Sequence, residues 1–298
     1  MGTPSYATEI LKVLVEDSDI EVVGLVTQMD KKVGRKQILT SPDTKRYLLE
    51  NEIEIVIYQP ETLKTEEAYE KIKSFDADFI VVAAYGQILP KSILDICPCI
   101  NLHASILPKY RGASPIQDAI LNQDKYSGVT AMLMDVGLDT GDILSLSYLN
   151  IEKLNAPELF EKLSFHASSL TIETLKNFDN LKPLVQNSSE ATYSKKIKKE
   201  DGLLDMKDAK SCEAKFRSYI FWPGVYLQSS LKLKELSVYE YESQNSAGEI
   251  LDISKDSIVL ACEVGSLKLS RVQPTSKKEM SVIDYIRGKR LEVGDSLS

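Results

Sequence analysis

The sequence has little of what metal sites, disulfide frameworks and membrane spans require. Its 298 residues include four cysteines, two histidines and one tryptophan, and no two cysteines form a C-x-x-C pair. That spacing suits neither a zinc site nor a disulfide framework, so we expect reduced, buried thiols in a cytoplasmic protein. No run of eighteen apolar residues is present, and no basic stretch followed by an apolar one opens the chain. We therefore expect neither a membrane span nor a secretory signal.

The charge is acidic overall but unevenly distributed. The net charge of −8, taken alone, argues against binding of a nucleic acid. The first 190 residues carry 28 Asp and Glu against 18 Lys and Arg, whereas the rest of the chain carries 16 against 18. A mildly basic C-terminal part is compatible with ordinary solvated surface. This positive charge suggests binding of a polyanion only if another feature of the sequence does so too.

Length and apolar periodicity predict two domains. A chain of 298 residues, 43% of them hydrophobic, is long enough to bury two cores. Apolar strands such as residues 78–84 alternate with helices up to a long amphipathic helix at 156–178. This pattern predicts an α/β domain with a mostly parallel sheet over residues 1–178. Polar residues at 179–200 indicate a linker, and short strands over 201–298 predict a small OB-like β-barrel.

The first residues make an unusual start for an α/β domain. Gly2, Thr3 and Pro4 form a predicted turn that opens a helix ending near Glu16, and a buried strand at residues 20–26 follows. In a βαβ unit such a turn normally comes after a strand. The domain therefore either starts on a helix or uses an upstream strand that lies outside this chain.

A polar segment at residues 27–42 carries a cluster of positive charge. Lys31, Lys32, Arg35 and Lys36 surround a glycine, and the segment has no apolar period, so we expect a long loop. Such a cluster in an acidic domain fits a contact with phosphate, and it fits a solvated mobile loop equally well.

The strongest candidate site lies in residues 97–117, where a short strand meets a turn-rich segment. Asn101 and His103 are two residues apart on the expected strand, so their side chains share one face. Open α/β sheets bind ligands at the carboxyl ends of their strands. A second polar loop at 135–142 contains three aspartates, among them Asp139, and two glycines. Three carboxylates this close could bind a metal or form a structural turn.

These motifs together resemble a known family. The segments N-L-H-A-S-I-L-P-K-Y-R-G-A-S-P-I-Q and G-V-T-A-M-L-M-D-V-G-L-D-T-G-D-I-L are similar to those of the folate-dependent formyltransferases, most of all those that act on methionyl-tRNA. The likeness continues through M-G-T-P, A-A-Y-G-Q-I-L-P and F-W-P-G to Q-P followed by K-K-E-M near the end of the chain. It therefore covers nearly the whole sequence.

The resemblance implies a fold, a reaction and a set of site residues. It implies a Rossmann-like formyltransferase domain and an OB-like domain, with 10-formyltetrahydrofolate as co-substrate and initiator methionyl-tRNA as the partner. The catalytic residues of the family fall on Asn101, His103 and Asp139. No metal and no membrane contact are implied, and we expect a monomer. The family pattern places folate contacts at Tyr85, Gly86, Ser105, Ile106, Leu107, Pro108 and Val136, and tRNA contacts at Arg35, Lys36, Lys277 and Lys278.

The residue types suit acyl transfer to an amine. Asn101 and His103 can donate hydrogen bonds to an oxyanion, and Asp139 can orient His103 and help to remove a proton from the amine. The alternative role for Asn101 and His103 is a buried hydrogen-bonded pair with no catalytic function.

The chain departs from the family pattern at its start. The family has an apolar strand of roughly six residues directly before M-G-T-P, near the middle of the sheet. We expect its loss to leave two neighbouring strands unpaired.

Three other functions share part of the pattern. Sugar-nucleotide N-formyltransferases carry N-x-H and L-P-K-Y-R-G, but they usually differ around Asp139, where this chain keeps V-G-L-D-T-G-D. Glycinamide ribonucleotide formyltransferases lack the C-terminal barrel. A non-catalytic RNA-binding protein on the same scaffold would not need Asn101, His103 and Asp139 together.

Overall fold

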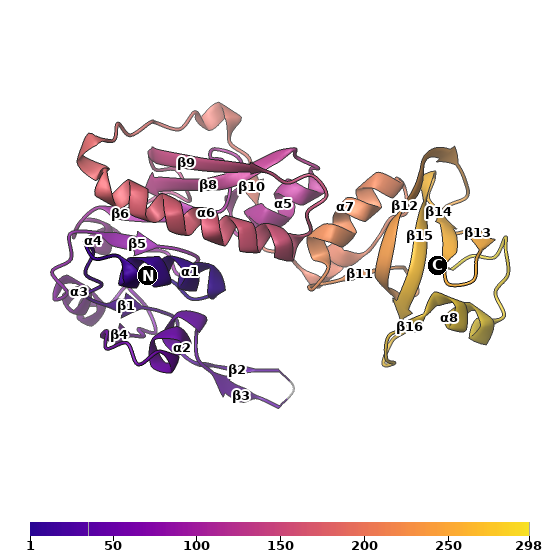
Figure 1. Ribbon diagram of the computed structural model, residues 1–298, viewed down its shortest axis with the longest axis horizontal. Helices are drawn as coiled ribbons and strands as arrows, with labels where there is room; N and C mark the ends of the chain where they lie inside the picture. The colour runs from indigo at the N-terminus through magenta and orange to yellow at the C-terminus, as the bar shows by residue number, and fades with distance from the viewer. Residues whose placement is uncertain (35, 298) are drawn as a thin grey trace. The chain divides into compact units, whose positions relative to one another are not determined.

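The computed structural model describes residues 1–34 and 36–297, which form two compact units (Figure 1). The first unit comprises Met1–Pro115, Tyr126–Asn150 and Pro157–Ser194. The second comprises Ile116–Lys125, Ile151–Ala156 and the chain from Lys195 onward. The chain thus crosses between the units several times.

Two neighbouring sheets form the centre of the first unit. In one, β1 (Leu25–Val26) pairs in parallel with β4 (Ile57–Tyr58). In the other, the strand order is β5 (Ile80–Val82), β6 (Cys99–His103), β8 (Tyr126–Leu133) and β9 (Ile143–Asn150). β5 and β6 are parallel, and β8 and β9 extend the sheet in antiparallel fashion. The carboxyl ends of β5 and β6 therefore lie at the same edge, where the candidate site was predicted.

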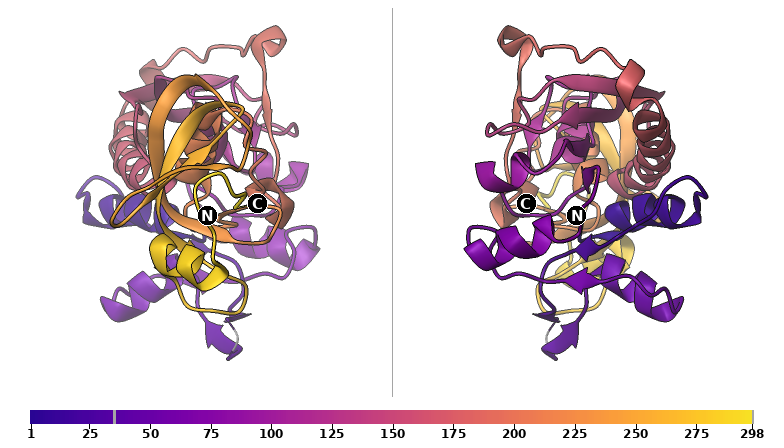
Figure 2. Two further views of the ribbon diagram at one scale, coloured as in Figure 1. Left: turned by 90° about the vertical axis from the view of Figure 1, so that its right-hand side faces the viewer. Right: turned by 90° about the vertical axis from the view of Figure 1, so that its left-hand side faces the viewer.

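Five helices of the first unit pack around these sheets: α1 (Ser5–Glu16), α2 (Asp43–Glu50), α3 (Glu66–Lys73), α4 (Lys91–Leu94) and α6 (Ala156–Lys176). The rings of Tyr6 and Phe160 lie 5.9 Å apart edge to face, so α1 and α6 pack side by side (Figures 1 and 2). α6 buries Leu159, Leu163 and Leu170 at helical spacing, as its sequence predicts. His166 on the same helix bonds to Ser147 Oγ, 2.5 Å from its Nδ1, and lies outside the candidate site.

The basic segment at residues 27–42 is a β-hairpin rather than the expected loop. β2 (Lys31–Val33) pairs with β3 (Ile38–Thr40), and Gly34 in the connecting turn has a φ of 70°. All three residues of β2 are exposed, so the segment has no buried face and therefore no apolar period for the sequence to display.

The strands β1 and β5 are shorter than predicted. The sequence predicts strands at 20–26 and 78–84, but only Leu25–Val26 and Ile80–Val82 are paired as strands. Met1 and Gly2 lie between their ends: the Gly2 amide donates to the Val26 carbonyl (3.1 Å), and the Ala83 amide donates to the Met1 carbonyl (2.9 Å). Away from these two residues the facing edges of β1 and β5 have no strand between them in the described chain.

Much of the stretch predicted as a linker is anchored to the first unit. Leu184 exchanges backbone hydrogen bonds with Ile143, at distances of 2.8 and 2.9 Å. β10 (Tyr193–Ser194) pairs in parallel with β7 (Arg111–Gly112). Polar composition does not reveal these contacts, because the backbone makes most of them.

The second unit is built on an antiparallel sheet. Its strands run β11 (Val225–Tyr226), β12 (Lys232–Gln244), β15 (Val264–Gln273), β14 (Ile258–Ala261) and β13 (Ile250–Ile253), with β16 (Met280–Ser281) on β15. The core residues Leu260, Leu267, Leu269 and Val272 are fully buried. The helices of this unit are most of α5 (Pro115–Leu121), α7 (Ala209–Tyr219) and α8 (Val282–Lys289).

The structure confirms the predicted fold class, a Rossmann-like domain followed by a smaller domain of antiparallel strands. Closure of these strands into an OB-like barrel stays a prediction. Within the described part of the chain, no helix is both long enough and apolar enough to cross a bilayer.

Candidate active site

Strand β6 presents Asn101 and His103 on one face of the sheet. The alternate residues Ile100 and Leu102 are 1% and 2% exposed and fill the core on the other face. β5 and β8 hold β6 from both sides, with Asn101 opposite Met132 of β8. A strand paired on both edges fixes the two polar side chains relative to each other.

The loop after β8 brings Asp139 to this pair. Asn101 Nδ2 donates to Asp139 Oδ1 (3.3 Å), and His103 Nδ1 lies 3.7 Å from Asp139 Oδ2. The backbone amide of Gly112 also donates to Asp139 Oδ2 (2.8 Å). The side chains of His103 and Asp139 are 7% and 12% exposed, so water reaches them only in part. The three residues chosen from the sequence therefore form one cluster.

The hydrogen bond at Nε2 of His103 indicates which ring nitrogen carries the hydrogen. Its Nε2 lies 2.9 Å from the carbonyl oxygen of Tyr110. A carbonyl oxygen can only accept a hydrogen bond, so Nε2 carries the hydrogen and Nδ1 of the neutral ring holds a lone pair. That lone pair faces the Asp139 carboxylate, and a proton gained at Nδ1 would be attracted by the carboxylate.

Asp135 stabilises the loop that carries Asp139. Its carboxylate accepts from Thr140 Oγ1 (2.6 and 2.8 Å) and from the Gly137 amide (3.0 Å). A Cβ at Gly141 would lie 1.7 Å from the Leu133 carbonyl oxygen, so only glycine fits this position. These contacts fit the second of the two interpretations of the three aspartates, a structural turn. The described residues include no group of three or more His, Cys, Asp or Glu that could hold a metal ion.

Arg111 and Gln186 also support this loop, although no sequence pattern singles them out. Arg111, which is 1% exposed, donates from Nε and Nη2 to Gln186 Oε1 at 3.0 and 2.7 Å. Gln186 Nε2 donates to the carbonyl oxygens of Asp139 (2.9 Å) and Gly141 (2.7 Å). Asp139 has a φ of 53°, a conformation that needs support from its surroundings. Arg111 stands within the K-Y-R-G motif, but Gln186 lies in a polar stretch with no local signal.

The Ser105–Pro108 turn is only partly available to a ligand. Ser105 is fully buried and Leu107 is 3% exposed. Thr130 Oγ1 holds both of them, donating to the Ser105 carbonyl (2.7 Å) and accepting from the Leu107 amide (3.1 Å). Ile106 and Pro108 are half-buried. The side chains of Ser105 and Leu107 thus face the protein, and side-chain surface for a ligand comes from Ile106 and Pro108.

The other predicted folate contacts lie on two loops. Tyr85 follows β5 and is 2% exposed, and burial raises the pKa of its hydroxyl to about 12. Its carbonyl accepts from Thr3 Oγ1 (3.1 Å) and Gln28 Nε2 (3.2 Å), which ties the N-terminal turn to this loop. Gly86 has a φ of 84°. Val136, on the Asp139 loop, is 74% exposed.

The predicted tRNA contacts fall on both units. Arg35 lies outside the described residues. Lys36 is exposed in the turn between β2 and β3 of the first unit. Lys277 and Lys278 are exposed in the loop between β15 and β16 of the second unit. The lysines of each unit are thus accessible to a polyanion.

The comparison with known proteins agrees with this architecture. The sequence matches the family Formyl transferase over residues 1–175 and the family Formyl transferase, C-terminal domain over residues 196–290. The chain belongs to the formyl transferase family, as its motifs predicted.

Its relatives include curated proteins named methionyl-tRNA formyltransferase. One from Nitratiruptor sp. is 54% identical over 99% of this chain and 98% of its own length. One from Campylobacter jejuni subsp. doylei is 52% identical over 100% of this chain and 98% of its own length. The solved structure of WlaRD, a sugar 3N-formyl transferase, has a TM-score of 0.67 and 19% identity and covers 93% of this chain and 97% of that chain. At that identity the likeness to WlaRD shows a shared fold.

Proposed function

We propose that this protein transfers a formyl group from 10-formyltetrahydrofolate to the α-amino group of initiator methionyl-tRNA, for the initiation of translation. The main support is identity above 50% to methionyl-tRNA formyltransferases along 98% of their length. The clustering of Asn101, His103 and Asp139 at the end of β6 adds support from geometry. The cytoplasm is the proposed location, because charged initiator tRNA is used there.

The proposed domains have separate roles. Residues 1–178 form the proposed catalytic and folate-binding domain, 179–200 the connection, and 201–298 the OB-like tRNA-binding domain. Lys277 and Lys278 are the proposed contacts of the C-terminal domain with the tRNA backbone, and Arg35 and Lys36 are those of the hairpin. Because the net charge is −8, tRNA binding would depend on these local patches and weaken with salt.

The residues around Asp139 are suitable for a folate. Val136 and Leu138, on the loop that carries the carboxylate, are 74% and 58% exposed, and they offer apolar surface that a pterin ring could cover. WlaRD, which shares this fold, was solved in the presence of 5-N-formyl-THF, and this supports a folate as the co-substrate here. Bound 10-formyltetrahydrofolate would supply the formyl carbon. We assign its contacts to Tyr85, Gly86, Val136 and the Ser105–Pro108 turn.

Each cluster residue has a proposed role in the reaction. The neutral amine of the methionyl group attacks the formyl carbon, and Asn101 donates an amide hydrogen to the oxygen on which negative charge develops. His103 accepts the amine proton at Nδ1, where Asp139 stabilises the positive charge. His103 then returns a proton to the departing folate nitrogen. The new C–N bond thus replaces the old one with no change in proton count and no covalent link to the protein.

Sugar-nucleotide N-formyl transfer is the second candidate. The fold shared with WlaRD favours it, but the identity to that enzyme is only 19%. A protein that has lost catalysis and only binds RNA is the third candidate. The presence of Asn101, His103 and Asp139 together argues against it.

Formyl transfer to charged initiator tRNA tests the proposal. Purified protein and 10-formyltetrahydrofolate are incubated with initiator methionyl-tRNA, elongator methionyl-tRNA or a dTDP-amino sugar, and the formylated products are quantified. We expect formylation of the initiator tRNA at least tenfold above elongator tRNA. Activity confined to the amino sugar would refute the proposal.

A further inference from the structure

The hairpin of β2 and β3 projects from the body of the first unit (Figures 1 and 2). All three residues of β2 are exposed, as are Ile38 and Leu39 of β3. An isolated hairpin without a buried face is only marginally stable in water, and packing does not hold this one against the rest of the unit. The contacts at its base must therefore set its direction.

Asp30, directly before β2, joins the base of the hairpin to its surroundings. Its carboxylate accepts from Ser41 Oγ directly after β3 (3.2 Å), from Lys45 Nζ of α2 (3.0 Å to each oxygen) and from Gln59 Nε2 directly after β4 (2.9 Å). Lys45 Nζ also donates to Gln59 Oε1 (2.8 Å). Asp30, Lys45 and Gln59 therefore form a closed set of contacts, the hairpin anchor, which fixes the base of the hairpin to α2 and to the end of β4.

The ion pair of the anchor is partly shielded from water. The side chains of Asp30 and Lys45 are 26% and 21% exposed, so salt screens their attraction less than it screens a surface pair. Donation from Gln59 and Lys45 holds the pKa of the Asp30 carboxyl below its usual range, so the carboxylate is charged at neutral pH. Lys45 is thus used within the protein, whereas Lys36 in the hairpin turn is exposed.

The anchor is also connected to the sheet that carries the candidate site. Gln59 Nε2 donates to the Gln28 carbonyl (2.7 Å), and Gln28 Nε2 donates to the Tyr85 carbonyl (3.2 Å). Tyr85 lies on the loop after β5, and β5 is paired with β6, the strand of Asn101 and His103. The direction of the hairpin is therefore defined relative to the candidate active site.

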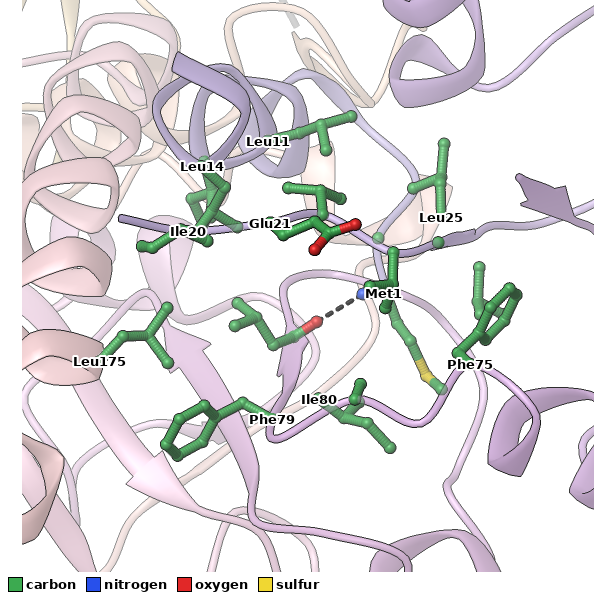
Figure 3. Close-up of a pocket in the computed structure, with 18 of the residues that line it drawn as sticks. Met1, Leu11, Leu14, Ile20, Glu21, Leu25, Phe75, Phe79, Ile80 and Leu175 are labelled. Carbon is green, nitrogen blue, oxygen red and sulfur yellow. Dashed lines mark hydrogen bonds between the residues drawn. The ribbon is translucent and has the colours of Figure 1, made fainter. Parts of the chain in front are cut away.

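The N-terminal turn holds the same Tyr85 carbonyl in place, because Thr3 Oγ1 donates to it (3.1 Å). The Ala83 amide donates to the Met1 carbonyl (2.9 Å) and thereby fixes this turn beside β5. The Met1 amine, at the wall of a cavity of about 530 Å³, donates to the Val81 carbonyl (dashed line in Figure 3). Burial lowers the pKa of this amine to about 5, because the charged form loses its hydration. The Tyr85 carbonyl is therefore a fixed point to which the anchor is joined.

We propose that Asp30, Lys45 and Gln59 are positioning residues, which hold the hairpin so that its lysines contact the tRNA backbone while the methionyl end lies in the candidate active site. This inference rests on the proposed function. The anchor acts through the hairpin, whose Lys36 is the proposed contact with tRNA. Without the anchor the hairpin would sample several directions, and tRNA binding would have to order it. The reacting groups would be unchanged once tRNA is bound.

The test removes a carboxylate charge at either of two positions. Asp30→Asn keeps the size of the side chain but takes away the charge that binds Lys45. Asp43→Asn is the matched control, because Asp43 also lies near the start of α2 and its ion pair is with Arg46 on the same helix (2.5 Å). Each substitution makes the net charge less negative by one, so electrostatics alone would strengthen tRNA binding in both variants. Formyl transfer to initiator methionyl-tRNA gives KM and kcat, and ¹⁵N relaxation gives the backbone order parameters of residues 31–33 and 38–40.

We expect Asp30→Asn to raise KM for tRNA about fivefold or more and to leave kcat within about twofold, because only the binding of tRNA depends on the anchor. The order parameters of the hairpin strands should fall by about 0.2 or more in this variant and stay constant in Asp43→Asn. Unchanged order parameters in Asp30→Asn, or a KM no higher than that of the control, would overturn the proposal.

A second variant covers the case in which Asp30→Asn does not fold. Lys45→Met removes the same ion pair from its other side, so the order parameters of the hairpin should fall in the same way. Constant order parameters in Lys45→Met would again refute the anchor. This measurement requires no substrate, so it judges the anchor even if the protein does not formylate tRNA and the proposed function fails.

Discussion

Replacement of Gln186 tests how the loop that carries Asp139 is held next to Asn101 and His103. Gln186→Ala removes the acceptor of two hydrogen bonds from the buried Arg111 and the donor of two hydrogen bonds to the Asp139 and Gly141 carbonyls. Gln186→Glu keeps an acceptor for Arg111 but places carboxylate oxygens against the two carbonyl oxygens. The two variants therefore separate support of Arg111 from support of the loop.

The expected magnitudes follow from these contacts. The loss of the acceptor of a buried guanidinium lowers the free energy of unfolding by about 3 kcal/mol. In a unit of this size, that decrease lowers the melting temperature by roughly 10 °C. Gln186→Glu keeps an acceptor for the Arg111 guanidinium, so we expect a smaller decrease. Both variants remove the hydrogen bond that supports the left-handed backbone conformation of Asp139, so its carboxylate can move. A shift of about 1 Å in a group that takes part in the reaction lowers kcat/KM by about 100-fold.

The assay is formyl transfer to initiator methionyl-tRNA, with thermal unfolding in parallel. Asn187→Ala is the matched control, because Asn187 is the neighbouring amide and is exposed, and its side-chain hydrogen bonds, to Ser189 and Glu190, are local. We expect that control to leave formyl transfer unchanged and to lower the melting temperature less than Gln186→Ala does. Full activity in Gln186→Glu would refute the claim that the amide donors of Gln186 position Asp139.

Three further predictions concern the cluster, the hairpin and the chain end. His103→Ala and Asp139→Ala are expected to lower kcat about 100-fold or more without unfolding the protein, because they remove the proposed proton acceptor and its proposed partner; near-normal turnover would exclude these roles. Lys36→Glu is expected to raise KM for tRNA several-fold and to leave kcat nearly unchanged, as a salt titration of the kinetics would show. Between pH 8 and 5 the unfolded chain protonates the Met1 amine and the folded chain does not, so the stability of the 298-residue chain should fall as pH decreases. Thermal unfolding over this pH range measures the effect, and a stability that does not fall would contradict the burial of the amine.

The sequence was sufficient to predict that Asn101, His103 and Asp139 would meet. Two residues apart on a strand means a shared face, and this relation depends on local spacing alone. The place of Asp139 came from the family resemblance, because β8 runs antiparallel to β6 and the loop after β8 therefore leaves beside the start of β6. Such relations can be read from periodicity and motifs.

The remaining features depend on contacts between distant segments. Gln186 reaches Arg111, 75 residues away, from a stretch whose polar composition indicated a linker. β2 and β3 have no buried face, so their pairing leaves no hydrophobic pattern. β1 and β5 are short because a strand forms only where its edge finds a partner, and hydrophobicity alone cannot show whether the partner is present.

The most direct test of the proposed function is the rate of formyl transfer to initiator methionyl-tRNA by the intact protein and by Asn101→Ala. Asn101 is the proposed donor to the oxygen that becomes negative, and the loss of one such donor costs about 100-fold to 1,000-fold in kcat. We predict efficient formylation of the initiator tRNA by the intact protein and a loss of that size in the variant. Formylation of a sugar-nucleotide amine with none on tRNA, or an unchanged kcat in the variant, would contradict the account.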